Sequence, residues 1–210
     1  KDLVEKEKNL SIEELITNKE AEITELSDAL NNPDAACAYA RQTAYLWASE
    51  TEKLYRLFNY PMKSRTKTAS DLDRIGIKAF FCSDVCCMYK LEIFDKLGGF
   101  DRSLRFNEDS IYAFGALMAG YTVEYSAKAV VFHSHNDSLP VQYRRSKELA
   151  ASQKEHPEVF GVVSSEHEGL RFFKESFGYL LKKKKYGDIA QLFVTCAVKY
   201  LGYFAGKHFN

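Results

Sequence analysis

Apolar residues follow helical spacing at both ends of the chain, and strand-like patterns lie between them. At the N-terminal end, the apolar stripe precedes Pro33 and consists of Ile12, Leu15, Ile16, Ile23, Leu26 and Leu30. The segment Ser11 to Glu14 has the form of a capping box, in which a serine and a glutamate three residues later satisfy the first backbone N–H groups of a helix. The pattern predicts a charged helix over residues 12–30.

The middle of the chain predicts strands that alternate with a helix. Residues 121–125 alternate in polarity, and residues 129–132 form a continuous apolar run suited to a buried strand. Residues 35–39 and 80–89 are also expected to be strands. Residues 108–119 place apolar side chains at helical spacing up to Gly120, which ends the helix. This alternation predicts an α/β fold with a sheet flanked by helices.

The last third of the chain is predicted to be helical, at residues 140–155, 165–182 and 188–206. The last two segments carry apolar stripes, at Leu170, Phe173, Phe177, Leu180 and Leu181, and at Ile189, Leu192, Phe193, Cys196, Leu201 and Phe204. Four lysines, Lys182 to Lys185, separate them. Two interpretations stay open: a hairpin that packs on itself with a solvated charged turn, or a surface that binds anionic lipid. No apolar run approaches the about 20 residues that a membrane span requires.

Glu108 and Asp109 stand in the first turn of the predicted central helix. A carboxylate there meets unpaired backbone N–H groups and the positive end of the helix dipole, which favour its ionised form. Helix capping is the common reason for such a pair. The alternative is a catalytic base, because a carboxylate within hydrogen-bond reach can take the proton of an attacking hydroxyl.

His133 and His135 follow the apolar run 129–132, at the end of a predicted strand. Ligands of α/β proteins bind at strand ends and in the loops that follow them. Two residues separated by one point to the same side of an extended chain, so both imidazoles could hold one metal ion. The competing interpretation is a pair of histidines without a ligand.

Two polar pairs near predicted strands are candidate substrate contacts. Arg41 and Gln42 follow the strand at 35–39, where the guanidinium could pair with a phosphate or a sugar hydroxyl, although a surface pair is the more common case. Ser83 and Asp84 interrupt the apolar run 80–89, where polar groups must form hydrogen bonds or face a cleft.

The order and spacing of these motifs resemble the C-terminal part of family 2 glycosyltransferases. The matching segments in the centre are Phe80 to Cys86, Tyr89-Lys90, Phe94, Leu97 to Asp101, Asn107 to Asp109, Ala119 to Tyr121, Tyr125, Ala129 to Val131 and His133 to His135. Flanking segments resemble the bacterial rhamnosyltransferase-like branch: Tyr39 to Gln42, Arg56 to Pro61, Glu168 to Leu170 and Lys199 to Tyr203. The resemblance extends from Ala21 to the C-terminal end.

The resemblance implies an inverting, metal-dependent transfer of a sugar, rhamnose in this branch, from a nucleotide donor such as dTDP-rhamnose to a bacterial surface-polysaccharide or lipid-linked acceptor. Asp109 matches the general base, and Glu108 would help to position the acceptor. His133 matches a position that often supplies a metal ligand, and His135 is the weaker candidate. The implied ion is Mg²⁺ or Mn²⁺, because a diphosphate offers hard oxygen ligands. The residues that line the site by the same resemblance are Arg41, Gln42, Ser83 and Asp84.

The start of the chain departs from that family. A complete enzyme of this kind begins with a strand of the Val-Ile-Pro-Thr-Tyr-Asn type and a nucleotide-binding part that ends in an acidic metal-binding motif. Residues 1–30 are instead charged and predicted to be helical. We therefore expect residues 1–139 to be the acceptor-side part of a GT-A glycosyltransferase domain with an atypical helical N-terminus, and residues 140–210 to be a helical appendage. We expect the chain by itself to be inactive; the alternative is a non-catalytic module that binds an acceptor or assembles with a partner.

Composition and charge change this picture little. The chain has 210 residues, no net formal charge and 46% hydrophobic residues, which suits a folded domain. Residues 171–210 carry eight basic and two acidic residues, so this end could face an anionic surface. No nucleic-acid-binding motif is recognised, so no nucleic-acid partner is expected. No signal peptide is recognised either, so the protein is expected to be cytoplasmic or peripheral on the inner face of the membrane.

The five cysteines, Cys37, Cys82, Cys86, Cys87 and Cys196, are an odd number, and three of them fall in the strand predicted at 80–89. No Cys-x-x-Cys pair accompanies a histidine at zinc-finger spacing. We interpret them as small core residues in a reducing compartment rather than as a metal site.

Overall fold

A mixed sheet with helices on both faces forms the centre of the molecule. The computed structural model describes residues 12–163 and 166–209, so Ser11 of the predicted capping box lies outside the described residues. Within this range, strands β1 (Ala35–Thr43), β2 (Arg65–Lys67), β3 (Cys87–Tyr89) and β4 (Thr122–Phe132) form one sheet in the order β2-β4-β1-β3. β1 and β4 are parallel, and the two short strands are antiparallel to their neighbours. The predicted α/β fold is confirmed.

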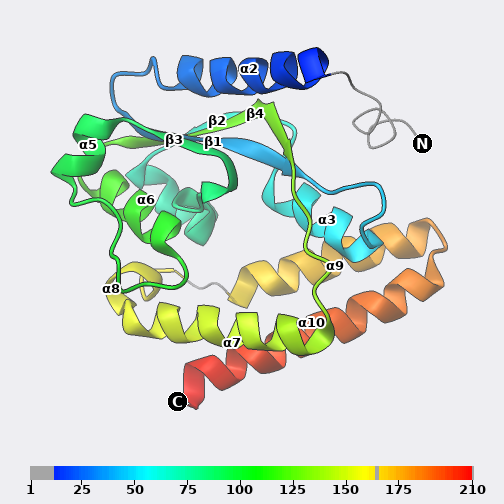
Figure 1. Ribbon diagram of the computed structural model, residues 1–210. Coiled ribbons are helices and arrows are strands. Elements are labelled where there is room, and N and C mark those ends of the chain that lie inside the picture. The colour runs from blue at the N-terminus through cyan, green and yellow to red at the C-terminus, as the bar shows by residue number, and fades with distance from the viewer. Residues whose placement is uncertain (1–11, 164–165, 210) are drawn as a thin grey trace.

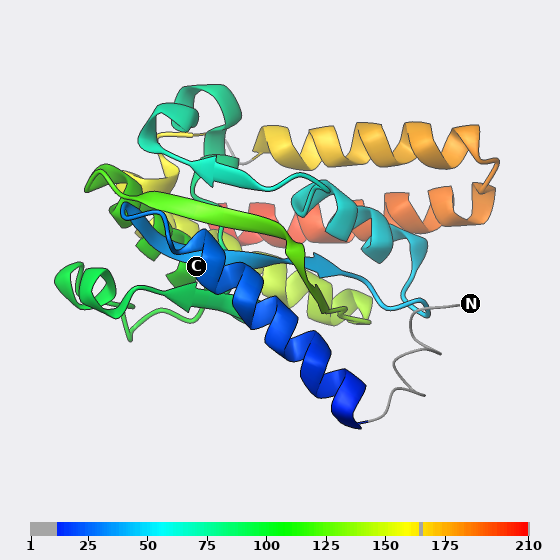
Figure 2. The ribbon, with the colours of Figure 1, turned by 90° about the horizontal axis from the view of Figure 1, so that it is seen from above.

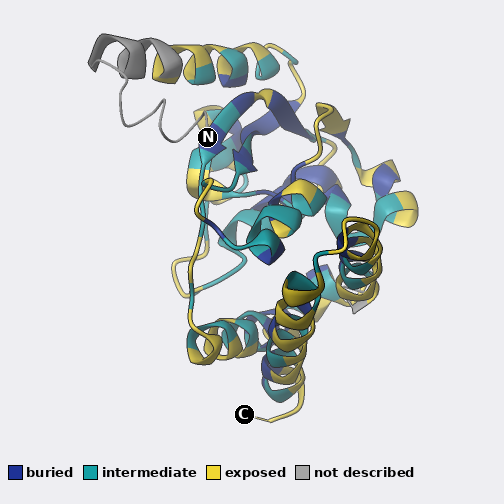
Figure 3. Cartoon of the chain, turned by 90° about the vertical axis from the view of Figure 1, so that its right-hand side faces the viewer, coloured by how far each residue is buried: buried dark blue, intermediate teal, exposed yellow. Residues whose placement is uncertain are grey.

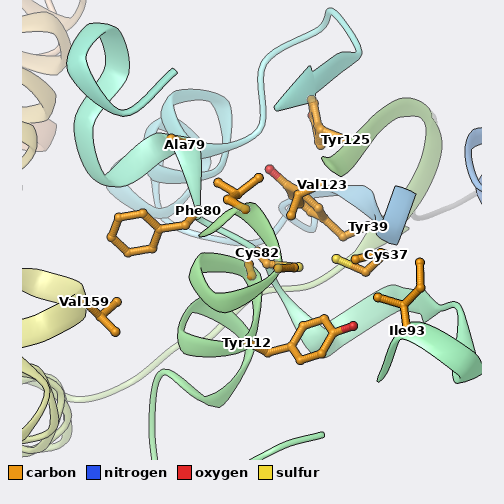
Figure 4. Packing of buried hydrophobic residues seen from close by; sticks show 14 of the residues in the cluster. Cys37, Tyr39, Ala79, Phe80, Cys82, Ile93, Tyr112, Val123, Tyr125 and Val159 are labelled. Carbon is orange, nitrogen blue, oxygen red and sulfur yellow. The ribbon is translucent and has the colours of Figure 1, made fainter. Parts of the chain in front are cut away.

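The two faces of β1 bury different kinds of side chain, because successive residues of a strand point to opposite sides. On one face, Ala38 and Ala40 pack with Leu26 of helix α2 (Ile12–Ala29), which lies across the sheet (Figures 1 and 2). On the other face, Cys37 and Tyr39 enter a larger core shared with helix α6 (Glu108–Met118) (Figure 4). The small alanine side chains let α2 approach the sheet closely, whereas the opposite face carries the bulkier core.

The strands predicted at 121–125 and 129–132 are one continuous strand, β4. Its register with β1 shifts between Ala40 and Arg41, and the Arg41 Nε donates a hydrogen bond to the Ala127 carbonyl at this irregularity (2.9 Å). β1 also runs to Thr43, so Arg41 and Gln42 lie within the strand and not after it. The prediction ended this strand too early because Arg41 and Gln42 are polar, but tertiary hydrogen bonds satisfy both side chains.

The strand predicted at 80–89 is wrong over most of its length. Only Cys87–Tyr89 is a strand, and the polar pair Ser83-Asp84 instead leads into a 3-10 turn, η3 (Asp84–Cys86). The pairing register with β1 covers Cys87 to Tyr89 alone. An apolar run does not by itself specify a strand, since the segment needs a partner along its length.

The last third of the chain is helical, as predicted. The three predicted helices are α7 (Leu139–Glu155), α9 (Glu166–Lys182) and α10 (Tyr186–His208), and the pattern missed the short helix α8 (Pro157–Phe160). Phe172 and Leu192 of the α9–α10 hairpin pack against helix α3 (Glu50–Asn59). The remaining short elements are η1 (Ala69–Asp71), α4 (Leu72–Ile75), η2 (Gly76–Ala79) and α5 (Leu91–Lys96).

Helix α10 is longer and more apolar than the sequence analysis anticipated. Within the described part of the chain, it is the one helix whose length of 23 residues and composition would let it cross a membrane. Core helices of soluble proteins pass the same test. In this structure α10 packs along α7 and against α9 (Figure 1).

Helices α7 and α10 approach each other at two glycines of α10. A Cβ atom added at Gly202 would lie 2.3 Å from the carbonyl oxygen of Tyr143, and one added at Gly206 would lie 2.1 Å from that of Lys147. These distances are far inside van der Waals contact. Residues four apart share one face of a helix, so the two glycines form one flat contact surface that brings the backbones together.

Candidate active site

The acidic pair opens α6, as predicted, and the C-terminal helices hold the residue before it. Asn107 adopts a left-handed conformation (φ 67°), and its Nδ2 donates to the Ser152 hydroxyl of α7 (3.0 Å). The same hydroxyl donates to the carbonyl of Phe106 (2.9 Å). Asparagine tolerates this backbone region better than most residues. The hydrogen bonds from α7 therefore fix the direction from which the chain enters the acidic pair.

Asp109 has properties of both a capping residue and a general base. Its Oδ1 accepts hydrogen bonds from the backbone N–H of Ser110 (2.6 Å) and from the Ser110 hydroxyl (3.2 Å). Burial is the largest cause that raises the pKa of Asp109 to about 7, and the nearby Cys82, Asp84 and Glu108 contribute to the same shift. A carboxyl group that titrates near neutrality suits proton transfer, and capping alone does not require this.

Asp84 and Glu108 join Asp109 in what we call the acidic cluster. Burial raises the pKa of Asp84, whose Oδ1 accepts a hydrogen bond from the Tyr89 hydroxyl. The Oε2 atom of Glu108 is buried and has no hydrogen-bond partner within the described residues. A buried carboxylate oxygen without a donor is costly, so this atom is suited to accept a hydrogen bond from a bound ligand.

Gln42 and Ser83 connect the acidic cluster to α3. The Gln42 side chain is 3% exposed, and its Nε2 donates to the Ser83 hydroxyl (2.7 Å). Its Oε1 accepts a hydrogen bond from the guanidinium of Arg56. Arg56 also donates from Nε and Nη2 to Oε1 of Glu52 (3.0 and 2.8 Å). A continuous polar network thus runs from Glu52 to the segment that carries Asp84.

Arg41 lies outside this network. Its Nε bonds the Ala127 carbonyl, and its Nη1 contacts the Met62 sulfur (3.1 Å). Of the four residues proposed to line the site, Gln42, Ser83 and Asp84 are brought together, whereas the contacts of Arg41 are with the irregular part of β4 and the Met62 loop. Arg41 in this conformation braces the sheet.

The two histidines converge at the other end of the network. Their Nε2 atoms are 2.8 Å apart, and the backbone N–H of His135 points to Glu52 Oε1 (3.4 Å). Burial lowers the pKa of both imidazoles, and the positive charge of Arg56 lowers each further. Both rings are therefore neutral at pH 7, which is the form that binds metal ions. The hydrogen bonds that lead from Glu52 through Arg56 and Gln42 to Ser83 lie between the histidine pair and the acidic cluster.

The histidine pair fits part of a metal site. Adjacent ligands of an octahedral ion at about 2.1 Å lie about 3.0 Å apart, close to the observed separation of the two Nε2 atoms. Two ligand atoms are too few for Mg²⁺ or Mn²⁺, which take about six. The other ligands would be diphosphate oxygens, water or groups from elsewhere in a longer protein.

Glu52 and Arg56 were not identified from the sequence as members of the polar network. Arg56 is 7% exposed although it is charged, and it connects a helix with a strand. Its spacing of four from Glu52 is the signal that could have identified the ion pair. Nothing in the spacing predicts its contact with Gln42, because that contact depends on how α3 packs on β1.

Comparison with known proteins gives two relatives that cover most of the chain. No protein-family profile matches it, and no solved structure matches it. The O-antigen chain rhamnosyltransferase RfbN of Salmonella typhimurium is 33% identical over 194 residues, which are 88% of this chain and 61% of the relative. The O-antigen chain rhamnosyltransferase WbaN of Salmonella anatum is 30% identical over 204 residues, 96% of this chain and 64% of the relative. The chain thus spans somewhat over three fifths of the length of two proteins named as rhamnosyltransferases, and is related to them.

Proposed function

We propose that this chain is the acceptor-side part of a rhamnosyltransferase that acts in the synthesis of a bacterial surface polysaccharide. The donor would be a nucleotide-rhamnose such as dTDP-rhamnose, and the acceptor a growing glycan, lipid-linked in the cell. The fold would be of the GT-A type in family 2. The observation that carries the proposal is the carboxyl group of Asp109 with a pKa of about 7, beside the unpartnered Oε2 of Glu108, in a chain similar to proteins named rhamnosyltransferases.

In the proposed reaction, Asp109 takes the proton of an acceptor hydroxyl as the hydroxyl oxygen attacks C1 of the sugar. The new bond forms between that oxygen and C1, the bond from C1 to the diphosphate oxygen breaks, and the diphosphate leaves with the electron pair. Attack opposite the leaving group inverts the configuration at C1. Glu108 Oε2 accepts a hydrogen bond from another acceptor hydroxyl, which orients the acceptor.

A divalent cation, Mg²⁺ or Mn²⁺, would neutralise the charge on the leaving diphosphate. His133 and His135 would supply two of its ligands. Glu52 accepts a hydrogen bond from the backbone N–H of His135, and Arg56 holds Glu52, so the polar network positions the backbone of the segment that carries the histidines.

Replacement of either histidine is expected to raise the Mn²⁺ concentration required for half-maximal transfer by about tenfold or more. Because the two Nε2 atoms converge, the geometry predicts that His133→Ala and His135→Ala raise the required Mn²⁺ concentration to a similar extent. The resemblance implied a weaker effect for His135. His208→Ala, at the end of α10, is the control. Metal titrations of a complete protein that show the same requirement in all three variants and wild type would remove this role.

The chain by itself is expected to bind no nucleotide-rhamnose. Within the described residues, the histidine pair provides two metal ligands, and the relatives contain a large further part that this chain does not match. Isothermal titration of the purified chain with dTDP-rhamnose and Mn²⁺ measures this. Saturable micromolar binding, about −8 kcal/mol, would place the donor site within these residues and contradict the proposed division. Acceptor binding without transfer by a complete protein would favour the non-catalytic alternative.

The α9–α10 hairpin would bring the protein to the inner face of the cytoplasmic membrane. Many residues of its two helices are exposed (Figure 3). The exposed residues include large apolar ones: Leu170, Tyr179, Leu181, Tyr186, Phe193, Val194, Tyr200, Leu201 and Phe204. Lys182 to Lys184 are exposed at its turn, while Lys185 pairs with Glu50. Apolar side chains next to lysines suit anionic lipid. The other interpretation is a hairpin that packs on itself. The ring contacts of Phe173 and Phe177 with Phe193 support it, because they join the two helices.

Cosedimentation with vesicles distinguishes the two interpretations of the hairpin. Binding to vesicles that contain phosphatidylglycerol, weakened by salt and by exchange of Lys182, Lys183 and Lys184 for Gln, is expected for a membrane surface. If the wild type and the variant bind the vesicles equally, or if neither binds, the interpretation as a hairpin that packs on itself is the one supported.

A further inference from the structure

Three cysteines from separate segments converge in the core beneath the acidic cluster. Cys37 comes from β1, Cys82 from the segment before η3, and Cys87 is the first residue of β3. Their sulfur atoms all lie within 4.8 Å of one another, and those of Cys82 and Cys87 are 3.8 Å apart. Cys37 and Cys82 are buried in the core, as Figure 4 shows. The interpretation of the cysteines as separate core residues does not predict this convergence.

The sheet register explains how the sulfur atoms meet. Tyr39 of β1 is opposite Cys87 of β3, and Cys37 is opposite Tyr89. Residues two apart in a strand share a face, and diagonal neighbours across an antiparallel pair are within reach of each other. Cys37 and Cys87 therefore project into the same core, where Cys82 approaches them from the adjoining segment.

The separations match a metal site better than a disulfide. All five cysteines are free, and 3.8 Å is about twice the length of an S–S bond, which is about 2.05 Å. Thiolates bound to tetrahedral zinc at about 2.3 Å lie about 3.8 Å from one another. The Cys82–Cys87 separation has this value already, and no separation in the group exceeds it by more than about 1 Å.

The surrounding charge favours a divalent ion. Lys67 is 4% exposed, and its ammonium group interacts electrostatically with Cys37 and Cys82. Three thiolates bound to one divalent cation carry a net charge of minus one, whereas three thiolates bound to a monovalent ion carry minus two, so the cost of burying charge favours the divalent ion. Soft sulfur ligands select zinc over the hard ions that a diphosphate would bring.

We propose that Cys37, Cys82 and Cys87 bind one Zn²⁺ ion through their three sulfur atoms. The ion ties the segment before η3 to β1 and β3. Ser83 and Asp84 follow Cys82 directly, so the ion would fix the residues that connect the polar network with the acidic cluster. This site differs in ligand chemistry and location from the histidine pair, and it does not depend on the proposed transferase activity.

Titration of the reduced, metal-free 210-residue chain with Cd²⁺ tests the proposal, because cadmium–thiolate bonds absorb in the ultraviolet in proportion to their number. Wild type is expected to saturate at one equivalent with the absorbance of three thiolates, and Zn²⁺ is expected to displace the Cd²⁺. Cys82→Ser and Cys87→Ser should bind at least 100-fold more weakly. Cys86→Ser, the neighbouring cysteine outside the group, should behave as wild type.

Absence of saturable binding by the wild type, or an absorbance of fewer than three thiolates at one equivalent, would overturn the proposal. The same holds if Cys86→Ser weakens binding as much as Cys82→Ser. Circular dichroism checks that each variant is folded. If the serine variants do not fold, the absorbance of the wild type still decides the number of thiolates.

Discussion

Asp109→Asn is expected to lower kcat for rhamnosyl transfer by about 10²–10⁴-fold and to leave donor affinity nearly unchanged. Asparagine keeps the size of the side chain and the oxygen that accepts from Ser110, but it cannot take a proton. The assay needs a complete protein, for example this chain joined to the part of the Salmonella typhimurium relative that it does not match. Turnover beside a donor titration measures both quantities, with the exposed Asp95→Asn of α5 as control. Near-wild-type turnover in Asp109→Asn would exclude it as the base.

The pH dependence of rhamnosyl transfer should also show the titration of Asp109. Because the pKa of Asp109 is about 7, kcat/KM should rise with pH up to about this value and then level off.

The ionisation of Asp109 also affects the free energy of unfolding. The folded pKa lies above the unfolded value of about 3.9, so the stability associated with the protonated carboxyl is present below about pH 4 and is lost as pH rises through 7. Asp109→Asn should therefore melt at a higher temperature than wild type at pH 8, and at nearly the same temperature at pH 4.

Gly206→Ala is expected to lower the free energy of unfolding by about 1–3 kcal/mol. The added methyl group would sit 2.1 Å from the Lys147 carbonyl oxygen and 2.9 Å from Ala150 Cβ, so α7 and α10 must separate. Loss of that contact also loosens Ser152, which holds Asn107 before the acidic pair. Transfer activity of a complete protein should then fall together with stability.

Gly178→Ala in α9 is the matched control for the glycine contact. A Cβ atom there would meet no heavy atom within 4 Å, and alanine favours a helix over glycine by about 1 kcal/mol, so this variant should be neutral or stabilised. Urea denaturation of both variants gives the comparison. Equal changes in stability would show that α7 and α10 do not approach each other as closely as described.

Helices α2, α6, α9 and α10 were predictable because each carries an apolar stripe that the local sequence displays, whereas helices α3, α4 and α5 were not predicted. The predicted ranges 108–119 and 140–155 differ from α6 and α7 by one residue at an end. The short strand β2 was not predicted, and the strand predicted at 80–89 is reduced to β3, since the pairing of each with its three partner residues is a tertiary contact. Helix α8 is a single turn after Pro157 and is too short to show a period.

The candidate site was predictable as a set of residue types but not as an arrangement. The acidic pair and the two histidines were identified from their positions at a helix start and a strand end. The link between them required Arg56 to reach Gln42 from another element, which no spacing encodes. The cysteine group was missed for the same reason: Cys37 and Cys82 are 82 − 37 = 45 residues apart, and only the packing of β1 against the segment before η3 brings them together.

Sugar transfer by a complete protein decides most directly whether this chain belongs to a rhamnosyltransferase. The protein is incubated with dTDP-rhamnose, Mn²⁺ and a lipid-linked O-antigen acceptor, and the molecular mass of the acceptor is measured by mass spectrometry. We expect the acceptor to gain one deoxyhexose residue with the wild type and to remain unchanged with Asp109→Asn. An acceptor of unchanged mass after incubation with folded wild type, whether or not the donor is consumed, would contradict the proposed function.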